Sequence, residues 1–360
     1  MGEIDCTGAG MKLVGLTPFP ILPAHFGGAE RCWNVLKRLG PIDIHGLDWN
    51  GKFDEQRVGD VFYTVRPPSP EASHRAELLV AQGFMTYDTM PHMARAFLDE
   101  YRAVVDASEP DMIILEHPFL IDFVGDRPFI YDSHNAETLS HAQRFGVNRA
   151  EFLHVKELER RAVQGAVAVT YCSEADAAVL REMFGDFHGV HVPNGVTLPE
   201  LLDDTNRDVL LFVGSVYQPN IDAAQRLIAL APQLREFQIV IAGGCGHFVQ
   251  NTEPNVDVLG TVSEDELDLL FRRSVAFVNL VSHGSGTHLK VGRALAYGVP
   301  VITSEVGARG YSSPIVTDDV PRAVAKVVAY SQHYRGEARA EAETLSWDKV
   351  VEPMRELVGR

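Results

Sequence analysis

The stretch VAFVNLVSHGSGTHLKVGRALAYGVPVITS, residues 275–304, carries the clearest structural signal in the chain. Its residues 275–279 are mostly β-branched or aromatic, which is typical of a buried strand. The small residues at 284–287 then predict a turn, and apolar residues at helical spacing predict a helix over 289–297. A glycine and a proline end that helix, and residues 299–303 read as a second buried strand.

The glycine-rich turn suits an anionic ligand. A helix that begins beside glycines presents free backbone N–H groups and the positive end of its dipole, and both favour a phosphate or diphosphate. The same glycines are also compatible with an ordinary strand–helix–strand crossover, in which they serve only the turn. Taken alone, the stretch leaves both interpretations open.

Strand and helix patterns alternate through both halves of the 360-residue chain, which predicts an α/β protein with two Rossmann-like, doubly wound parallel sheets. Two domains are expected at this length, each large enough for its own core. The turn sequence Pro-Asn-Gly marks the boundary between them. We therefore expect a first domain over 11–193, a second over 194–344, and a final helical segment over 345–360. Residues 149–164 predict a charged amphipathic helix with a solvated face.

The composition excludes several classes of protein. An apolar fraction of 46% and a charged fraction of 22% are those of a soluble globular protein. The formal charge of −17 argues against nucleic acid or an anionic membrane as a partner. The four cysteines form no C-x-x-C pair, and neither a signal peptide nor an apolar run of about 18 residues is present, so a cytoplasmic protein is expected. No D-x-D motif or ligand-spaced His/carboxylate cluster predicts a metal site, and no cofactor is expected.

The segment GSGTHLKVGRALAYGVPVITSEVGARG, residues 284–310, resembles the donor-binding segment of the retaining GT-B glycosyltransferases of family four, the glycosyl transferases of group 1. Further motifs match that family in the expected order. They are GGAER at 27–31, YDSHNAE at 131–137, CSEAD at 172–176, VPNGV at 192–196, and VGS at 213–215 followed by PN at 219–220.

The resemblance implies a GT-B fold, in which an N-terminal acceptor domain and a C-terminal donor domain face a cleft and the last helix crosses back to the first domain. It also implies an enzyme of the retaining hexosyltransferase type. The co-substrate would be a nucleotide-diphosphate sugar, and no divalent metal would be needed. The acceptor would be a carbohydrate or another small molecule, and the sequence does not identify it. The sequence also leaves open whether the protein forms a homodimer.

The same resemblance assigns site residues. His134 is expected to contact the donor sugar near the reaction centre, and Lys290 to supply charge to the leaving group. The candidates for donor binding are Gly214, Ser215, Gly284, Ser285, Gly286, Thr287, Lys290 and Arg293. On the acceptor side the candidates are Gly27, Gly28 and Glu30, although Glu30 and Arg31 are also compatible with a solvated first helical turn. His117, His283 and Asn194 are further candidates.

The sequence departs from the family at one position. Family members carry a glutamate that holds the nucleotide ribose where this chain has Arg293, and a second family glutamate would fall at Ser285. An arginine cannot accept a hydrogen bond from a ribose hydroxyl. Either the ribose is held by another group, or Arg293 contacts phosphate, or donor binding is impaired. Lys290 and Arg293 are three residues apart and can share one helix face.

Two other functions follow from these residues. Without either glutamate, the chain could be a non-catalytic GT-B-like binding or scaffold subunit. A related GT-B enzyme, an epimerase or a phosphorylase, ranks last because no lysine signature of the pyridoxal type is present. Loss of transfer on mutation of Lys290 would distinguish the enzyme from the scaffold.

Overall fold

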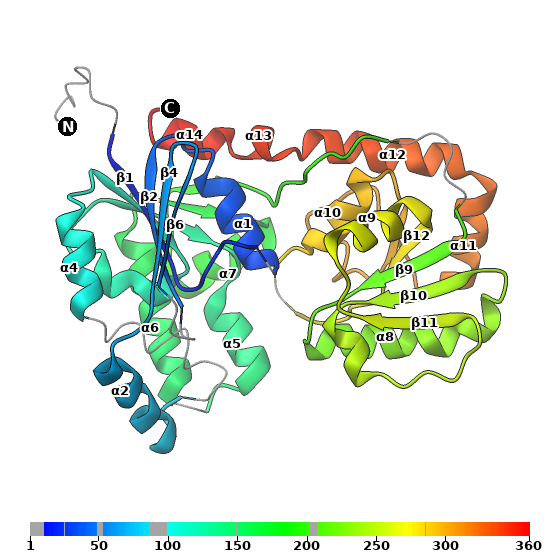
Figure 1. Cartoon of the computed structure of the whole chain (residues 1–360), viewed down its shortest axis with the longest axis horizontal. Coiled ribbons are helices and arrows are strands. Elements are labelled where there is room, and N and C mark those ends of the chain that lie inside the picture. Colours follow the sequence, from blue (N-terminus) through cyan, green and yellow to red (C-terminus); the bar gives the residue numbers. More distant parts are fainter. Residues whose placement is uncertain are drawn as a thin grey trace. The chain divides into compact units, whose positions relative to one another are not determined.

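The computed structural model describes residues 11–24, 26–48, 53–85, 99–148, 150–201, 207–284 and 286–360 (Figure 1). The chain forms two compact units. The first runs to Val192 and also includes Val351–Arg360, and the second is Pro193–Val350. Each unit is built on a mainly parallel sheet, which confirms the predicted α/β class with two Rossmann-like units.

The first unit contains an eight-stranded sheet in the order β3-β4-β2-β1-β5-β6-β7-β8. Its strands are β1 (Leu13–Thr17), β2 (Ile42–Leu47), β3 (Asp54–Val58), β4 (Val61–Arg66), β5 (Met112–Glu116), β6 (Phe129–Ser133), β7 (Ala168–Tyr171) and β8 (Gly189–His191). All pairings are parallel except that of β3 with β4. The sequence analysis did not predict β3, because this exposed edge strand reads DEQRV and lacks apolar alternation.

The helices of the first unit are α1 (Gly27–Leu36), α2 (Pro70–Ala81), α4 (Asp99–Ala107), α5 (Glu137–Phe145), α6 (Ala150–Gly165), α7 (Glu174–Phe184) and α14 (Glu352–Leu357), with the short 3-10 helix η2 (Pro118–Phe123). The last residue, Arg360, secures the C-terminal segment, because its guanidinium donates to the carbonyls of Met11 at 2.6 Å and Pro41 at 3.1 Å. The predicted solvated character of α6 is only partly correct. Glu151 and Glu159 on this helix are buried.

The second unit contains a fully parallel six-stranded sheet in the order β11-β10-β9-β12-β13-β14. Its strands are β9 (Val209–Val213), β10 (Gln238–Ala242), β11 (Val256–Gly260), β12 (Ser274–Asn279), β13 (Val301–Thr303) and β14 (Ile315–Val316). Successive residues of β9 alternate between two cores: Leu210 and Phe212 pack in one, and Val209 and Leu211 in the other. Because both faces are covered, β9 is a continuous apolar run rather than an alternating one.

The helices of the second unit are α8 (Gln218–Leu230), α9 (Glu264–Arg273), α10 (Leu289–Ala296), α11 (Val320–Ala329), α12 (Ser331–Thr344) and α13 (Trp347–Val350), with the 3-10 helices η3 (Ala231–Gln233) and η4 (Gly244–Phe248). Figure 1 shows α8 on one side of this sheet and α9 and α10 on the other. Ser263 and Glu266 form a complete capping box at the start of α9. The predicted strand, helix and strand of residues 275–304 are β12, α10 and β13.

Both sheets have a point where the strand order reverses, between β1 and β5 in the first unit and between β9 and β12 in the second. Open α/β sheets bind ligands beyond the carboxyl ends of the strands at such points. In each unit, these loops hold several of the residues that the sequence analysis selected.

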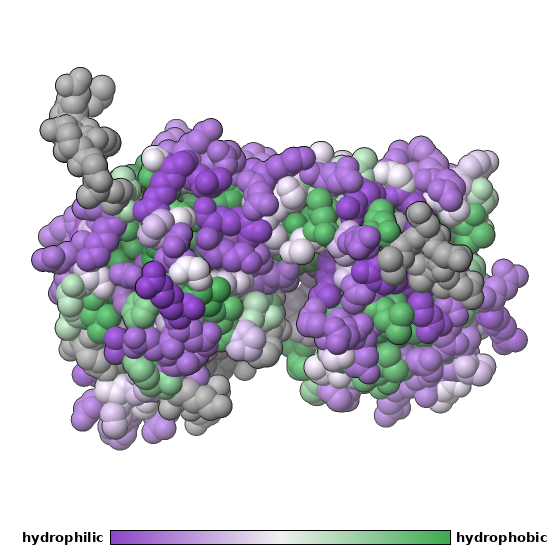
Figure 2. Space-filling model, turned by 45° about the horizontal axis from the view of Figure 1, so that its top comes forward, coloured by the Kyte–Doolittle hydropathy of each residue, from purple (hydrophilic) through white to green (hydrophobic). Residues whose placement is uncertain are grey.

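On the face shown in Figure 2, hydrophilic residues predominate and hydrophobic ones lie in small scattered patches. Among the described residues, no helix is both long enough and apolar enough to cross a bilayer.

Candidate functional site

In the first unit, polar side chains gather at the carboxyl ends of β5 and β6. Glu116 is the last residue of β5, Asp132 lies near the end of β6, and His134 follows that strand. Arg31 and Cys32 come from the first turns of α1. All five side chains are buried, and Glu116 and Asp132 are completely inaccessible to solvent.

A bidentate ion pair joins α1 to β6. The Arg31 guanidinium donates to Asp132 from Nη2 to Oδ1 at 2.7 Å and from Nε to Oδ2 at 3.1 Å. The hydroxyl of Thr170, on the neighbouring strand β7, donates to the same Oδ1 at 2.6 Å. Burial alone would raise the pKa of Asp132, but Arg31 and His134 together hold that pKa well below its usual range. Arg31 is therefore not the solvated residue that the sequence allowed.

His134 shares a proton with a buried carboxylate. Its Nε2 lies 2.6 Å from Oε2 of Glu116 and 3.6 Å from Oδ2 of Asp132. Burial alone would lower the pKa of the imidazole, but the two neighbouring carboxylates, Asp132 and Glu116, raise the pKa to about 9. The pair of His134 and Glu116 thus retains a proton at neutral pH.

His117 lies beside His134 in an unusual backbone conformation. Its φ of 71° is rare for a residue other than glycine, and such strain is concentrated at functional sites. The two imidazole rings are 4.3 Å apart between centroids. Nδ1 of His117 contacts Oε1 of Glu137 at 3.1 Å, while the buried Nε2 has no hydrogen-bond partner. Burial and the neighbouring His134 lower the pKa of His117, so its ring is neutral.

The glycine loop of the first unit packs closely against two aromatic rings. Helix α1 begins at Gly27, and a Cβ at Gly28 would lie 3.0 Å from the ring of Phe26 and 3.3 Å from that of Phe19. Glu30 is half-buried in the first turn, and its backbone N–H donates to the carbonyl of Phe26. These three expected residues lie at the start of the helix that supplies Arg31 and Cys32.

In the second unit, Lys290 contacts the loop that follows β9. Its Nζ donates to Oδ1 of Asn220 at 2.7 Å and lies 4.4 Å from the centroid of the Phe212 ring. The side chain is half-buried, and burial lowers the pKa of its amine to about 7. Asn220 in turn donates from Nδ2 to the carbonyl and hydroxyl oxygens of Ser215, at 3.2 and 3.3 Å.

Glycines let the loops of this unit approach one another closely. A Cβ at Gly214 would lie 2.8 Å from Cβ of Asn220 and 2.9 Å from Sγ of Cys245. A Cβ at Gly243, which has a φ of +97°, would lie 2.3 Å from the carbonyl oxygen of Gly214. The glycines therefore bring the ends of β9 and β10 together beside the lysine.

The turn before α10 is held by side chains on both sides. The amide of Asn194 donates to the hydroxyl of Thr287 at 2.7 Å, and Nδ1 of His288 lies 3.0 Å from Nδ2 of Asn279. Burial and the charge of Lys290 lower the pKa of His288 to about 3, so this ring carries no charge at neutral pH.

Gly284 and Gly286 have φ values of 130° and 71°, which explains the choice of glycine. Ser285 lies outside the described residues. His283 is exposed, and its Nε2 is 3.9 Å from the carboxylate of Asp222.

Arg293 is directed away from Lys290. Its Nη2 lies 2.8 Å from Oε2 of Glu264 at the start of α9, and its guanidinium lies over the ring of Phe271. Lys290 instead contacts Asn220 of α8, and α8 and α9 pack on opposite faces of the sheet. The two cations of α10 therefore do not form one group.

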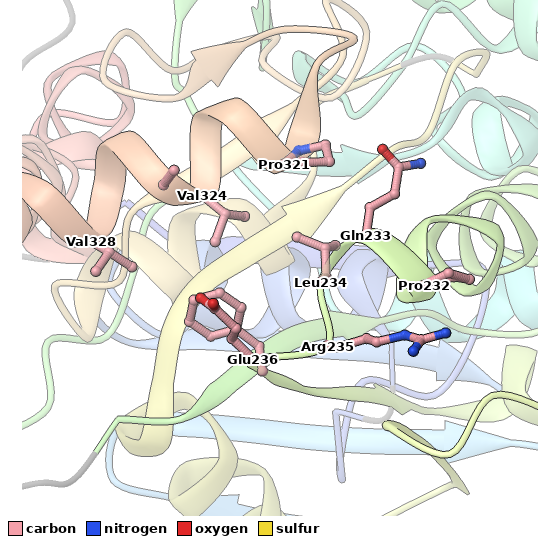
Figure 3. A pocket seen from close by; sticks show the side chains of 10 residues that line it. Pro232, Gln233, Leu234, Arg235, Glu236, Pro321, Val324 and Val328 are labelled. Atoms are coloured by element: carbon pink, nitrogen blue, oxygen red, sulfur yellow. The ribbon is translucent and has the colours of Figure 1, made fainter.

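A hollow of about 500 Å³ lies elsewhere on the second unit. Figure 3 shows Val324 and Val328 of α11 opposite Leu234 and Glu236 of the turn that enters β10. None of its lining residues belongs to the expected site, and the turn lies at the amino end of β10, away from the glycines.

Sequence reasoning missed several members of both groups. They are Arg31, Cys32, Glu116 and Asp132 in the first unit and Asn220 and Cys245 in the second. The spacing of these residues in the chain follows no known motif, so it did not point to a common site. Of these, Arg31, Asp132 and Asn220 lay within motifs that matched the family.

Comparison with known proteins identifies the second group. The family described as glycosyl transferases group 1 matches residues 207–331. These residues include Asn220, Lys290 and all the glycines described above in the second unit. The second unit thus resembles the group 1 glycosyltransferases over most of its length. No curated protein sequence matches the chain significantly.

Solved structures match the chain over nearly its whole length. A sucrose-phosphate synthase from Thermosynechococcus elongatus has a TM-score of 0.72 at 14% identity, with 96% of this chain and 98% of that chain covered. A trehalose-6-phosphate structure from E. coli bound with UDP-2-fluoro glucose has a TM-score of 0.67 at 11% identity, covering 97% and 99%. An alpha,alpha-trehalose-phosphate synthase from Burkholderia xenovorans in complex with glucose-6-phosphate has 0.67 at 10%, covering 97% and 100%. The predicted GT-B fold is thereby confirmed.

The buried ion pair gives a first prediction. Asp132→Asn leaves the buried Arg31 uncompensated and should lower the free energy of unfolding by about 3–5 kcal/mol. Urea denaturation measures the change. Adding Arg31→Met should recover part of the loss, because the buried positive charge is then gone. Glu157→Gln, which breaks an exposed pair with Arg160, is the control and should leave the midpoint unchanged. Equal midpoints for Asp132→Asn and wild type would contradict the role of the pair.

Proposed function

We propose that the chain is a glycosyltransferase that moves a hexose from a nucleotide-diphosphate sugar to a carbohydrate or other small-molecule acceptor, with retention of anomeric configuration and without a divalent metal. The observation that carries this proposal is the position of Lys290. It lies with Asn220, Gly214 and Gly243 at the reversal point of the sheet in the unit that matches the group 1 family.

Lys290 has the properties that a leaving diphosphate requires. As the glycosidic bond breaks, negative charge develops on the diphosphate, and a preorganised cation and backbone N–H groups stabilise it. Asn220 fixes the ammonium group, and the turn at 286–288 leads into the N-terminus of α10. A bound diphosphate would favour the charged amine and reverse the effect of burial. Gly214 and Ser215 would line the same site.

The solved neighbours suggest the two substrates. One is bound with UDP-2-fluoro glucose and another with glucose-6-phosphate. A uridine diphosphate sugar is therefore the first donor to test, and a sugar phosphate is the first acceptor.

Arg293 leaves the ribose without the carboxylate that the family places at this position. We infer that Glu264 replaces it. The carboxylate of Glu264 is held at 2.8 Å by the guanidinium of Arg293, and four-fifths of its side chain is exposed to solvent. The arginine would then position an acceptor for the ribose hydroxyls rather than contact the ribose itself.

In the first unit, His134 is the proposed contact to the transferred sugar. Its Nε2 is committed to Glu116, so the protonated ring is held in one orientation. The free Nε2 of the neutral His117, next to it, would accept a hydrogen bond from a sugar hydroxyl.

A nucleotide titration tests the proposed function. Without metal, one of UDP, GDP, ADP, CMP and dTDP should raise the melting temperature, and UDP is expected to do so. At a hundredfold excess over the dissociation constant, binding stabilises by about 2.7 kcal/mol. Each kcal/mol corresponds to roughly 2–4 °C for a domain of this size. If no nucleotide changes the melting temperature of a folded sample, the scaffold function replaces the transferase.

The pH dependence of nucleotide binding tests Lys290. Because its pKa is about 7 without ligand, the amine must gain a proton to bind diphosphate above this pH. The affinity for UDP should therefore fall above pH 7, by up to tenfold per pH unit, as calorimetry would measure. Lys290→Arg keeps its charge at all these pH values and should remove the decline, while Lys290→Met should weaken binding at every pH. A flat profile for the wild type would contradict this role.

The ribose contact is tested by comparing two ligands. Glu264→Gln should weaken UDP binding about tenfold, because a charged acceptor is lost, and should leave pyrophosphate binding unchanged. Asp265→Asn, the adjacent acidic residue, is the matched control and should bind both ligands like the wild type. Equal loss for UDP and pyrophosphate in Glu264→Gln would mean that Glu264 acts on the phosphates or on the fold instead.

A further inference from the structure

Three metal-ligating side chains meet in the core of the first unit, although their spacing in the sequence gives no sign of it. Sγ of Cys32, Oε2 of Glu116 and Nε2 of His134 all lie within 4.8 Å of one another. Sγ is 3.4 Å from Oε2 and 3.8 Å from Nε2, and Nε2 is 2.6 Å from Oε2. The three residues come from α1, β5 and the end of β6, so their separation is set by the sheet and not by a flexible loop.

The distances are close to those of a tetrahedral zinc site. Bonds of about 2.3 Å to sulfur and about 2.0–2.2 Å to nitrogen and oxygen place the ligands of such a site about 3.3–3.6 Å apart. The two distances from Sγ already agree to within about 0.2 Å of this range. Only Oε2 and Nε2 must separate, by about 0.7 Å, when a metal ion replaces the proton between them. A rotation of the Glu116 carboxylate group is enough for this change.

The second carboxylate oxygen of Glu116 supports the same interpretation. Oε1 is buried and has no hydrogen-bond partner, although Glu116 is completely inaccessible to solvent. Buried carboxylate oxygens without a partner are rare and call for an explanation such as a bound ion. Rotation of the carboxylate can present this oxygen to a metal ion in place of Oε2.

The charges also match a divalent ion. Arg31 and Asp132 neutralise each other, and Asp132 is further occupied by Thr170. The remaining acidic groups, the thiolate of Cys32 and the carboxylate of Glu116, would together carry two negative charges. One thiolate, one imidazole and one carboxylate form a borderline-soft ligand set, which favours zinc over magnesium or calcium.

We propose that Cys32, Glu116 and His134 form a zinc-binding site. The ion takes Nε2 of His134, so this nitrogen can no longer hold the proton that it shares with Glu116. If His134 acts in transfer as proposed above, zinc therefore inhibits the enzyme. Zinc binding itself does not depend on that function.

Metal binding to the full chain tests the site. A Cys6→Ser background removes the thiol outside the described residues, and zinc is titrated in competition with a chromogenic chelator. One equivalent should bind, and cobalt in place of zinc should give a thiolate-to-cobalt charge-transfer band. Cys32→Ser should abolish that band, and Glu116→Gln should weaken zinc binding at least tenfold. Cys172→Ser, which changes a buried thiol outside the three ligands, is the matched control and should bind like the parent.

Two results would overturn the proposal. One is the absence of stoichiometric zinc binding to the folded parent protein. The other is binding that gives no thiolate band with cobalt or that survives Cys32→Ser. The cobalt spectrum of the parent decides the question even if a variant does not fold. Because no readout uses sugar transfer, a failed transferase assay and a failed zinc site remain distinguishable.

Discussion

The buried ion pair between Arg31 and Asp132 organises the candidate site of the first unit. It ties the first helix to the sixth strand, and the same helix turn carries Cys32 while the same strand leads to His134. A buried charge must be compensated, and here each partner compensates the other. The negative charge that remains is that of Glu116, and the protonated imidazole of His134 compensates it. A strained His117 beside this group shows that the surrounding packing, and not local preference, sets the geometry.

In the second unit, the candidate site is shaped by the backbone and by small residues rather than by a buried ion pair. Its fully covered sheet ends in loops that approach closely because Gly214 and Gly243 have no side chains. Asn220 then connects the loop after β9 to Lys290 on α10. Burial lowers the pKa of a lysine held this way to about 7, and a nearby anion would raise it again. His288, two residues before Lys290, stays neutral, and a second cation, Arg309, donates to the carbonyl of Gly284 in the turn before α10.

Much of this arrangement could be predicted from the chain. Residues 275–304 form the expected strand, helix and strand because a glycine-rich turn between two apolar runs permits few alternatives. Ser263 caps α9 through a local pattern, since a serine with a glutamate three residues later satisfies the free N–H groups. The edge strand β3 could not be found by the same means. Its side chains are exposed, so they show no periodic burial, and its pairing with β4 alone makes it a strand.

The sequence by itself determined the local elements, their alternation, the GT-B fold by family resemblance, and Lys290 and His134 as the residues of interest. Each of these depends on short-range patterns or on motifs that are continuous in the chain. The tertiary structure alone decided their partners: Asn220 for Lys290, Glu264 for Arg293, and Glu116 and Cys32 for His134. These partners lie 70, 29, 18 and 102 residues away. Strand order and helix packing bring them together, and neither is encoded in the spacing between the residues.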